Sequence, residues 1–167
     1  MKKTLNLALA LAMALAACTG SGKAENAADY KTTNQEGMKR VFNFIKGCKT
    51  YYIATTEGPQ PRVRPFGTVN VYDGKLYIQT GKKKRTARQL AENPLAEICC
   101  FDGERWIRVS GKLIPDERVE AKKAMLDAYP ELRSMYDEND YNTIVYYFQD
   151  ATAYLSSFTA PEEEIRF

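Results

Sequence analysis

The sequence predicts a mainly β protein: a six- to seven-stranded antiparallel barrel with helices packed on its outside. Three observations predict this fold. Short runs of β-branched and aromatic residues recur along the chain, separated by turn signals such as Asp73-Gly74 and Asp102-Gly103. Apolar residues at helical spacing are confined to a few short segments. The 167 residues, 44% hydrophobic and 27% charged, have the composition of one globular domain.

The N-terminal segment carries a targeting signal. Lys2 and Lys3 precede an apolar run that ends in small residues, which is the pattern of a secretory signal peptide over residues 1–17. The sequence Leu15-Ala16-Ala17-Cys18 resembles the bacterial lipobox. We therefore expect Cys18 to carry lipid and the protein to be exported, held on the periplasmic or cell-surface side of a bacterial membrane by that anchor alone. An ordinary cleaved signal with an incidental cysteine, or an uncleaved anchor, is the alternative.

The next segment, residues 18–35, is small and polar with little apolar periodicity. This composition predicts a flexible tether. The folded domain is then expected to cover residues 36–167.

Periodicity predicts the elements of this domain in order. A helix over 36–47 carries Met38, Val41, Phe42 and Ile45 on one face, and strands 50–56 and 62–72 flank a Gly-Pro turn. Strand 75–80 completes a hairpin across Asp73-Gly74, and a helix over 86–92 ends at Asn-Pro. Strands 95–101 and 105–114 form the next hairpin. Asp116 is expected to cap a helix that runs to residue 129, and strands 143–149 and 151–158 precede an acidic tail at 162–164.

The composition also excludes several functions. The chain has no histidine, so it has no Ser-His-Asp or Cys-His catalytic unit, no histidine-ligated zinc and no histidine general base. We expect no metal site. The net charge is +3, and loss of the two lysines in residues 1–17 lowers it to +1. A nearly neutral body gives no reason to expect nucleic-acid binding.

Three cysteines remain beside Cys18, and an odd number is not a disulfide framework. Cys99 and Cys100 are adjacent in a predicted strand, so their side chains should point to opposite faces. We expect both cysteines to be buried and to pack as small hydrophobic residues. A pairing of Cys48 with one of them in an oxidising compartment stays open.

Four consecutive cations, from Lys82 to Arg85, follow Gly81 and open the helix predicted at 86–92. Positive side chains at a helix N-terminus oppose the helix dipole. A bound anion would reverse this effect, because backbone N–H groups, lysine heads and the hydroxyls of Thr80 and Thr86 suit a phosphate. A solvated basic turn is the alternative. The segment lacks the glycine spacing of a P-loop.

A second pair of cations lies in strand 62–72. Alternation places Arg62, Arg64, Phe66 and Thr68 on one face, and Val63, Pro65, Gly67 and Val69 on the other. Two arginines one pleat apart favour an anion, although surface charges flanking an ordinary strand are the alternative. Pro65 removes a ladder donor, so the strand should be bulged or edge-like there.

The order of these motifs resembles the FMN-binding split-barrel family named after pyridoxamine 5'-phosphate oxidase. The resemblance covers about residues 36–167. It rests on Pro-Arg-Val-Arg-Pro-Phe in the second strand, Leu-Tyr-Ile-Gln-Thr-Gly-Lys-Lys-Lys after the third, Gln-Leu-Ala-Glu-Asn-Pro, and Trp-Ile-Arg-Val-Ser-Gly in the fifth. It implies a Greek-key-like split barrel that binds flavin mononucleotide (FMN) at the interface of a homodimer.

Carried onto this sequence, the resemblance assigns a set of cofactor-binding residues. It implies phosphate contacts from Arg62 or Arg64, Thr80, Lys83 and Lys84. It places Val63, Pro65, Phe66 and Gln79 along the flavin ring. Trp106 is a further candidate for the ring, with core or dimer interface as the alternative.

The sequence departs from the authentic oxidase, whose C-terminal Arg and His motif is missing here: the chain ends in Glu-Ile-Arg-Phe. We therefore expect an FMN-dependent oxidoreductase acting on a small planar compound (aromatic, nitro or pyridine-type) rather than on vitamin B6. Its catalytic residues and electron donor are not apparent, since export would separate it from NAD(P)H. The alternatives are a non-catalytic flavin- or haem-binding lipoprotein of the same fold, and an interaction lipoprotein that has lost its ligand.

Overall fold

The computed structural model describes residues 27–167, with side chains from residue 34 onward. The predicted signal peptide, the lipobox and Cys18 lie outside the described residues. The first described element is helix α1 (Ala27–Cys48), which begins nine residues before the start expected from its apolar spacing. No helix in the described part of the chain is long and apolar enough to cross a membrane.

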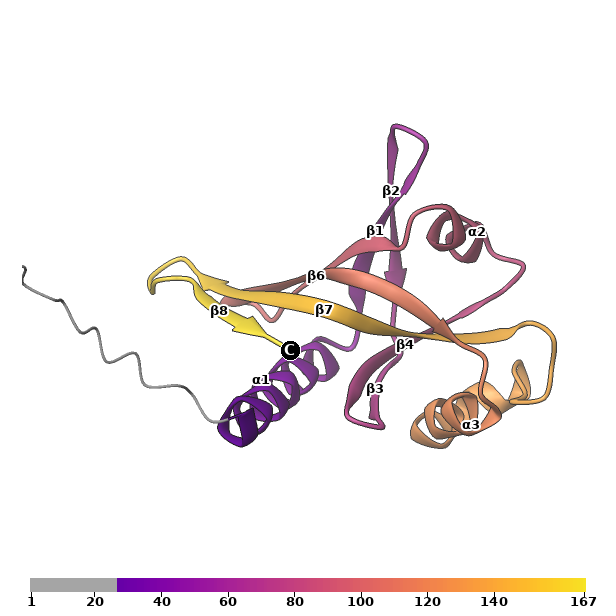
Figure 1. Cartoon of the computed structure of the whole chain (residues 1–167). Helices are drawn as coiled ribbons and strands as arrows, with labels where there is room; N and C mark the ends of the chain where they lie inside the picture. The colour runs from indigo at the N-terminus through magenta and orange to yellow at the C-terminus, as the bar shows by residue number, and fades with distance from the viewer. Residues whose placement is uncertain (1–26) are drawn as a thin grey trace, which may run out of the picture.

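The core of the fold is one antiparallel sheet of eight strands (Figure 1). The strands are β1 (Tyr51–Glu57), β2 (Gln60–Phe66), β3 (Val69–Tyr72), β4 (Lys75–Gly81), β5 (Leu95–Phe101), β6 (Arg105–Asp116), β7 (Thr143–Ser157) and β8 (Glu163–Arg166). Their order is β2-β1-β5-β6-β7-β4-β3, and β8 pairs with β7. The predicted mainly β antiparallel architecture with flanking helices is confirmed.

The sheet is closed by a short link between its two edges. β2 and β3 lie at opposite ends of the strand order, yet only Gly67 and Thr68 separate them in sequence. The Tyr51 hydroxyl donates a 2.7 Å hydrogen bond to the Thr68 carbonyl and fixes this link. The single strand predicted over 62–72 is therefore wrong: it is two strands that pair with different partners, β1 and β4.

The helices lie around the sheet. In Figure 1, α2 (Arg85–Glu92) and α3 (Val119–Ala128) lie on opposite sides of β7, while α1 lies beneath the end that carries β8. The main core contains aliphatic side chains with no exposed surface, among them Ile53, Ile78, Ile98 and Val109. A second cluster packs α3 against the sheet through Tyr77, Ala121, Met125 and Val145.

Two further expectations about the C-terminal half are wrong. The two strands predicted over 143–158 form one strand, β7, which bends at Asp150 (φ 54°) instead of ending there. Gly111 in β6 makes this bend possible, because a Cβ there would lie 3.1 Å from the Gln149 carbonyl oxygen. The segment expected as an acidic tail, 162–164, runs into β8, whose Ile165 is buried in the main core.

The start of α3 also differs from the expectation. Asp116 ends β6 and is buried, and the helix N-cap position belongs to Arg118. The Asp116 carboxylate accepts hydrogen bonds from the Tyr77 hydroxyl (2.8 Å) and from the Arg118 backbone and guanidinium. It therefore links β4, β6 and α3 and does not cap the helix.

The three described cysteines are free, with Cys100 buried and Cys99 and Cys48 half-buried. Burial raises the pKa of the Cys99 and Cys100 thiols, so both stay protonated at neutral pH.

Candidate functional site

A pocket forms where β2 passes into β3, beside the end of β4. Its cavity has a volume of about 220 Å³. One wall comes from the β2–β3 junction and β4, and the other from the 3₁₀ helix η1 (Pro130–Ser134) and the two residues that follow it. The lining residues are Pro65, Phe66, Gly67, Thr68, Gln79, Thr80, Lys84, Leu132, Met135 and Tyr136.

The β4 side of this pocket holds buried polar atoms that have no partner. Both amide atoms of Gln79 and the hydroxyl of Thr80 are buried without a hydrogen bond among the described residues. Gln79 and Thr80 are 6% and 3% exposed. An unsatisfied buried polar group costs about 1–3 kcal/mol. A ligand that offers both a donor and an acceptor to Gln79 would remove this cost.

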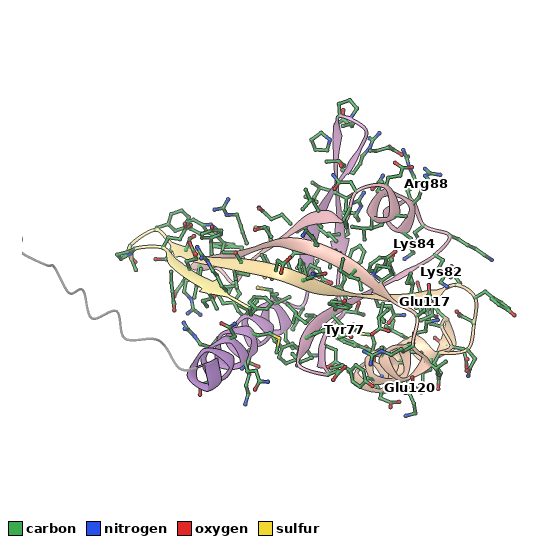
Figure 2. The ribbon with its side chains drawn as sticks, viewed as in Figure 1. Tyr77, Lys82, Lys84, Arg88, Glu117 and Glu120 are labelled. Carbon is green, nitrogen blue, oxygen red and sulfur yellow. The ribbon has the colours of Figure 1, made fainter. Side chains whose placement is uncertain are left out.

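The three lysines of the basic turn after β4 have different environments, and Figure 2 labels two of them, Lys82 and Lys84. Lys82 donates to Glu117 at 2.7 Å, and Glu117 also pairs with Lys122, so Lys82 is tied to α3. Lys84 lines the pocket, and within residues 34–167 no carboxylate pairs with it. The side chain of Lys83 is exposed and is not part of the pocket wall.

The backbone of this turn is held by Asn142. The Lys82 N–H donates to the Asn142 carbonyl at 2.7 Å, and the Lys83 N–H donates to its side-chain oxygen at 3.2 Å. Gly81 allows this approach, because a Cβ there would lie 3.1 Å from the Asn142 side chain. Helix α2 starts directly after the turn and has no acidic residue in its first turn. The position of Lys84 is therefore fixed by the backbone.

The two arginines of β2 share a face, as alternation predicts, but neither lines the pocket. Arg62 pairs with Glu57 at 2.8 Å, and Glu57 also accepts from Arg85 at 2.6 Å. Hydrogen bonds from Arg85 and Arg62 lower the pKa of Glu57, so this carboxylate is charged at neutral pH and offsets part of the local positive charge.

Arg64 has neutral partners. Its guanidinium donates to Thr55 Oγ1 at 2.7 Å and to Gln89 Oε1 at 2.6 Å, and Thr55 itself donates to Gln89. These bonds join β1, β2 and α2. Arg64 therefore has a structural environment in this chain.

The remaining two predicted residues lie on the outer face of the sheet. Val63 is 65% exposed. Trp106 packs against Phe158 with 5.1 Å between ring centroids and the rings tilted by 57°, and it pairs across the strands with Phe101. Neither lines the pocket of its own chain. Of the ten predicted residues, the pocket brings together Pro65, Phe66, Gln79, Thr80 and Lys84.

The residues that sequence reasoning missed are those of the second wall, Leu132, Met135 and Tyr136. These residues recur at i, i+3 and i+4, the spacing of one helical turn. This short apolar turn in an otherwise polar connection is the signal that could have identified them. Within residues 34–167 no cluster of three metal-ligating side chains occurs.

The residues of this pocket fit FMN. An unpaired lysine beside the start of a helix suits a phosphate. Unpartnered amide atoms of Gln79 suit the polar edge of a flavin ring, and Pro65 and Phe66 offer an apolar surface to its face.

Comparisons with known proteins agree with this fold. The family described as "Pyridoxamine 5'-phosphate oxidase" matches residues 38–146. The chain therefore belongs to the pyridoxamine 5'-phosphate oxidase family. More particularly, it shares 38% identity with a NimC/NimA family protein of Clostridium acetobutylicum, over 86% of this chain and 100% of that chain, with a TM-score of 0.80.

More distant structures share the fold alone. General Stress Protein 26 of Bacillus anthracis is 18% identical, over 80% of this chain and 98% of that chain, with a TM-score of 0.61. A heme binding protein of Mycobacterium smegmatis is 14% identical, over 73% and 57% respectively, with a TM-score of 0.55. A comparison with curated protein sequences found no match.

Proposed function

We propose that this protein binds FMN in the pocket between β2, β4 and η1 and is an oxidoreductase that acts on a small planar compound of aromatic, nitro or pyridine type. The observation that carries the proposal is the set of buried, unpartnered polar atoms of Gln79 and Thr80 beside the unpaired Lys84. Membership of a family that commonly binds flavin supports the same cofactor. Bound FMN would supply the hydride and electron chemistry.

Each pocket residue then has a definite role. Lys84 and the Thr80 hydroxyl bind the phosphate, and Asn142 holds the turn that carries Lys84. The Gln79 amide binds the polar edge of the ring, while Pro65 and Phe66 pack on its face. The chain itself contributes no histidine to proton transfer.

We propose that the functional unit is a homodimer, because a single chain leaves the pocket open and several large apolar side chains exposed on one face. Strand register places Tyr52, Val63, Leu95, Phe101 and Trp106 on one outer face, together with Pro65 of the pocket. We call these five residues, together with Pro65, the outer stripe. Tyr52, Val63, Leu95 and Phe101 are more than half exposed. Binding pockets usually enclose about 300–1,000 Å³, more than this cavity of about 220 Å³.

A second copy seated on the outer stripe would cover these side chains and close the pocket beside Pro65. In this arrangement Val63 and Trp106 would meet a flavin only across the interface, which accounts for their distance from the pocket of their own chain.

Flavin binding and turnover test the proposal separately. The protein is titrated with FMN, and bound flavin is followed by its absorbance and fluorescence. The FMN-loaded protein is then reduced anaerobically with one equivalent of dithionite and mixed with nitrobenzene. We expect reoxidation of the flavin faster than that of free reduced FMN at the same concentration. Absence of FMN binding would overturn the proposal.

The same experiment separates the oxidoreductase from a binding protein without activity. FMN binding with reoxidation no faster than that of free reduced FMN, for every acceptor tried, would favour a non-catalytic flavin-binding protein.

We further propose that the protein is exported and anchored through lipid on Cys18. The support is the lipobox-like sequence alone. Cys18→Ala should release the protein from the membrane fraction and abolish incorporation of labelled fatty acid. Unchanged fractionation and labelling would show that this proposal is wrong.

A further inference from the structure

The second wall of the pocket belongs to the connection between α3 and β7. This segment, residues 129–142, contains η1 and brings Leu132, Met135 and Tyr136 to the pocket. Met135 is 67% exposed although it lines the cavity, so it lies at the rim.

Hydrogen bonds and ion pairs hold this segment in place. The Tyr129 hydroxyl accepts from the Val69 N–H and donates to the Val69 carbonyl, both at 3.0 Å. The Lys46 ammonium lies 3.8 Å from the centre of the Tyr129 ring. At the other end, Asp140 accepts from the backbone N–H groups of Asn142 and Thr143. The wall is thus attached to β3 on one side and to the basic turn, through Asn142, on the other.

No charged side chain of the segment lines the pocket. Arg133 pairs with Asp127 at 2.6 Å and with Glu138 at 2.8 Å, and none of these residues lines the cavity. Lys84 is the one charged residue among the lining residues. The second wall therefore adds a thioether, an aliphatic side chain and a phenol to the cavity that Pro65 and Phe66 also line.

These three groups favour a particular kind of ligand. Methionine sulfur makes favourable contacts with aromatic rings, and tyrosine packs its ring on flat apolar surfaces. A carboxylate at this wall would lose water without gaining a cation, which is costly.

We propose that Met135 and Tyr136 are specificity-determining residues, which bind the acceptor beside the flavin and select a flat, uncharged aromatic compound over an anionic one. This inference rests on the proposed function, since it assigns the FMN phosphate to Lys84 and leaves the η1 side of the pocket to the acceptor.

The test uses FMN-loaded full-length protein and two matched probes, nitrobenzene and 4-nitrobenzoate. Binding of each probe is followed by the change it causes in the absorbance of oxidised flavin. Met135→Ala and Tyr136→Ala should each lower the affinity for nitrobenzene about threefold to tenfold. The affinity for FMN should change less than about twofold. Met135→Lys should lower the affinity for nitrobenzene and raise the affinity for 4-nitrobenzoate, so that the preference between the probes is reversed.

Tyr141→Ala is the matched control, because Tyr141 belongs to the same segment, is 95% exposed and does not line the pocket. It should leave the affinities for FMN and for both probes unchanged. Tight FMN binding by all variants, with probe affinities equal to those of Tyr141→Ala, would overturn this inference alone. Failure of the wild-type protein to bind FMN would overturn the proposed function, and this inference with it.

Discussion

Lys83 and Lys84 are adjacent in sequence but differ in their surroundings. Both side chains are exposed, but Lys84 lines the pocket and Lys83 does not. If Lys84 binds the dianionic phosphate, a charge-assisted bond worth about 1.5–3 kcal/mol is at stake. Lys84→Ala should then lower the affinity for FMN roughly tenfold to a hundredfold in an equilibrium titration at fixed ionic strength.

Riboflavin and Lys83→Ala are the controls for this prediction. Riboflavin lacks the phosphate, so its affinity should change little in Lys84→Ala. Lys83→Ala removes an equal positive charge at the neighbouring residue. It should lower the affinity for FMN by less than about threefold, because salt screens long-range attraction. Equal losses for FMN and riboflavin would instead indicate damage to the fold.

Arg64 should matter for stability more than for the phosphate. Its removal would leave Thr55 Oγ1 without a donor and Gln89 Oε1 with the Thr55 hydroxyl as its remaining donor, at a cost of about 1–3 kcal/mol in the free energy of unfolding. Urea unfolding of Arg64→Ala against Arg62→Ala would measure this difference. Arg62 is 41% exposed at its side chain and pairs on the surface, so its loss should cost less than about 1 kcal/mol. A selective loss of FMN over riboflavin in Arg64→Ala would contradict the structural role.

The sequence could identify these cations but not divide their roles. Alternation in β2 correctly placed Arg62 and Arg64 on one face. Their partners, however, depend on tertiary contacts: Gln89 reaches Arg64 only because α2 packs against β1, the neighbour of β2, and Glu57 reaches Arg85 from the far end of the first hairpin. Such contacts join residues more than twenty positions apart, which no local pattern describes.

The contact between β4, β6 and α3 depends on a buried carboxylate. Hydrogen bonds, mainly from Arg118 and also from Tyr77, lower the pKa of Asp116 to about 2. Because the folded-state pKa is depressed from 3.8, the stabilisation is complete above about pH 4 and is lost as the pH falls toward 2. It amounts to roughly 2 kcal/mol at neutral pH.

Asp116→Asn should therefore lower the free energy of unfolding by roughly 2 kcal/mol at pH 7, and the difference from wild type should shrink between pH 4 and pH 2. Urea unfolding at a series of pH values checks this. Glu104→Gln is the control, because Glu104 is exposed and forms no ion pair within residues 34–167. A difference that does not change with pH would contradict the assignment.

Most elements could be predicted from periodicity, because hairpins and amphipathic helices leave local patterns. The errors occur where long-range pairing decides. The β2–β3 link looks like continuous strand because Gly67 and Thr68 interrupt no hydrophobic pattern. β7 continues through Asp150 because Gly111 on β6 accommodates the bend. β8 carries a single buried apolar side chain, Ile165, too few to show a period.

At the scale of the whole molecule, the outer stripe and the open pocket point to one arrangement. A homodimer in which each copy covers the other's stripe would bury four large apolar side chains per chain, Tyr52, Val63, Leu95 and Phe101. The same contact would place the second copy next to Pro65 and so complete the wall that one chain lacks. Assembly and flavin binding should then be linked.

This linkage gives a prediction about the stripe. Val63→Glu combined with Leu95→Glu would place four carboxylates per dimer in the interface without partners, and the cost of burying such charges should raise the dimer dissociation constant at least a hundredfold. Light scattering at micromolar concentration should show a dimer for wild type and a monomer for the variant. FMN affinity should fall together with dimer formation, and in wild type it should decline on dilution below the dimer dissociation constant. Tyr141→Glu, on a side chain 95% exposed outside the stripe, should stay dimeric. A wild-type monomer with full flavin occupancy would show that the pocket is complete in one chain.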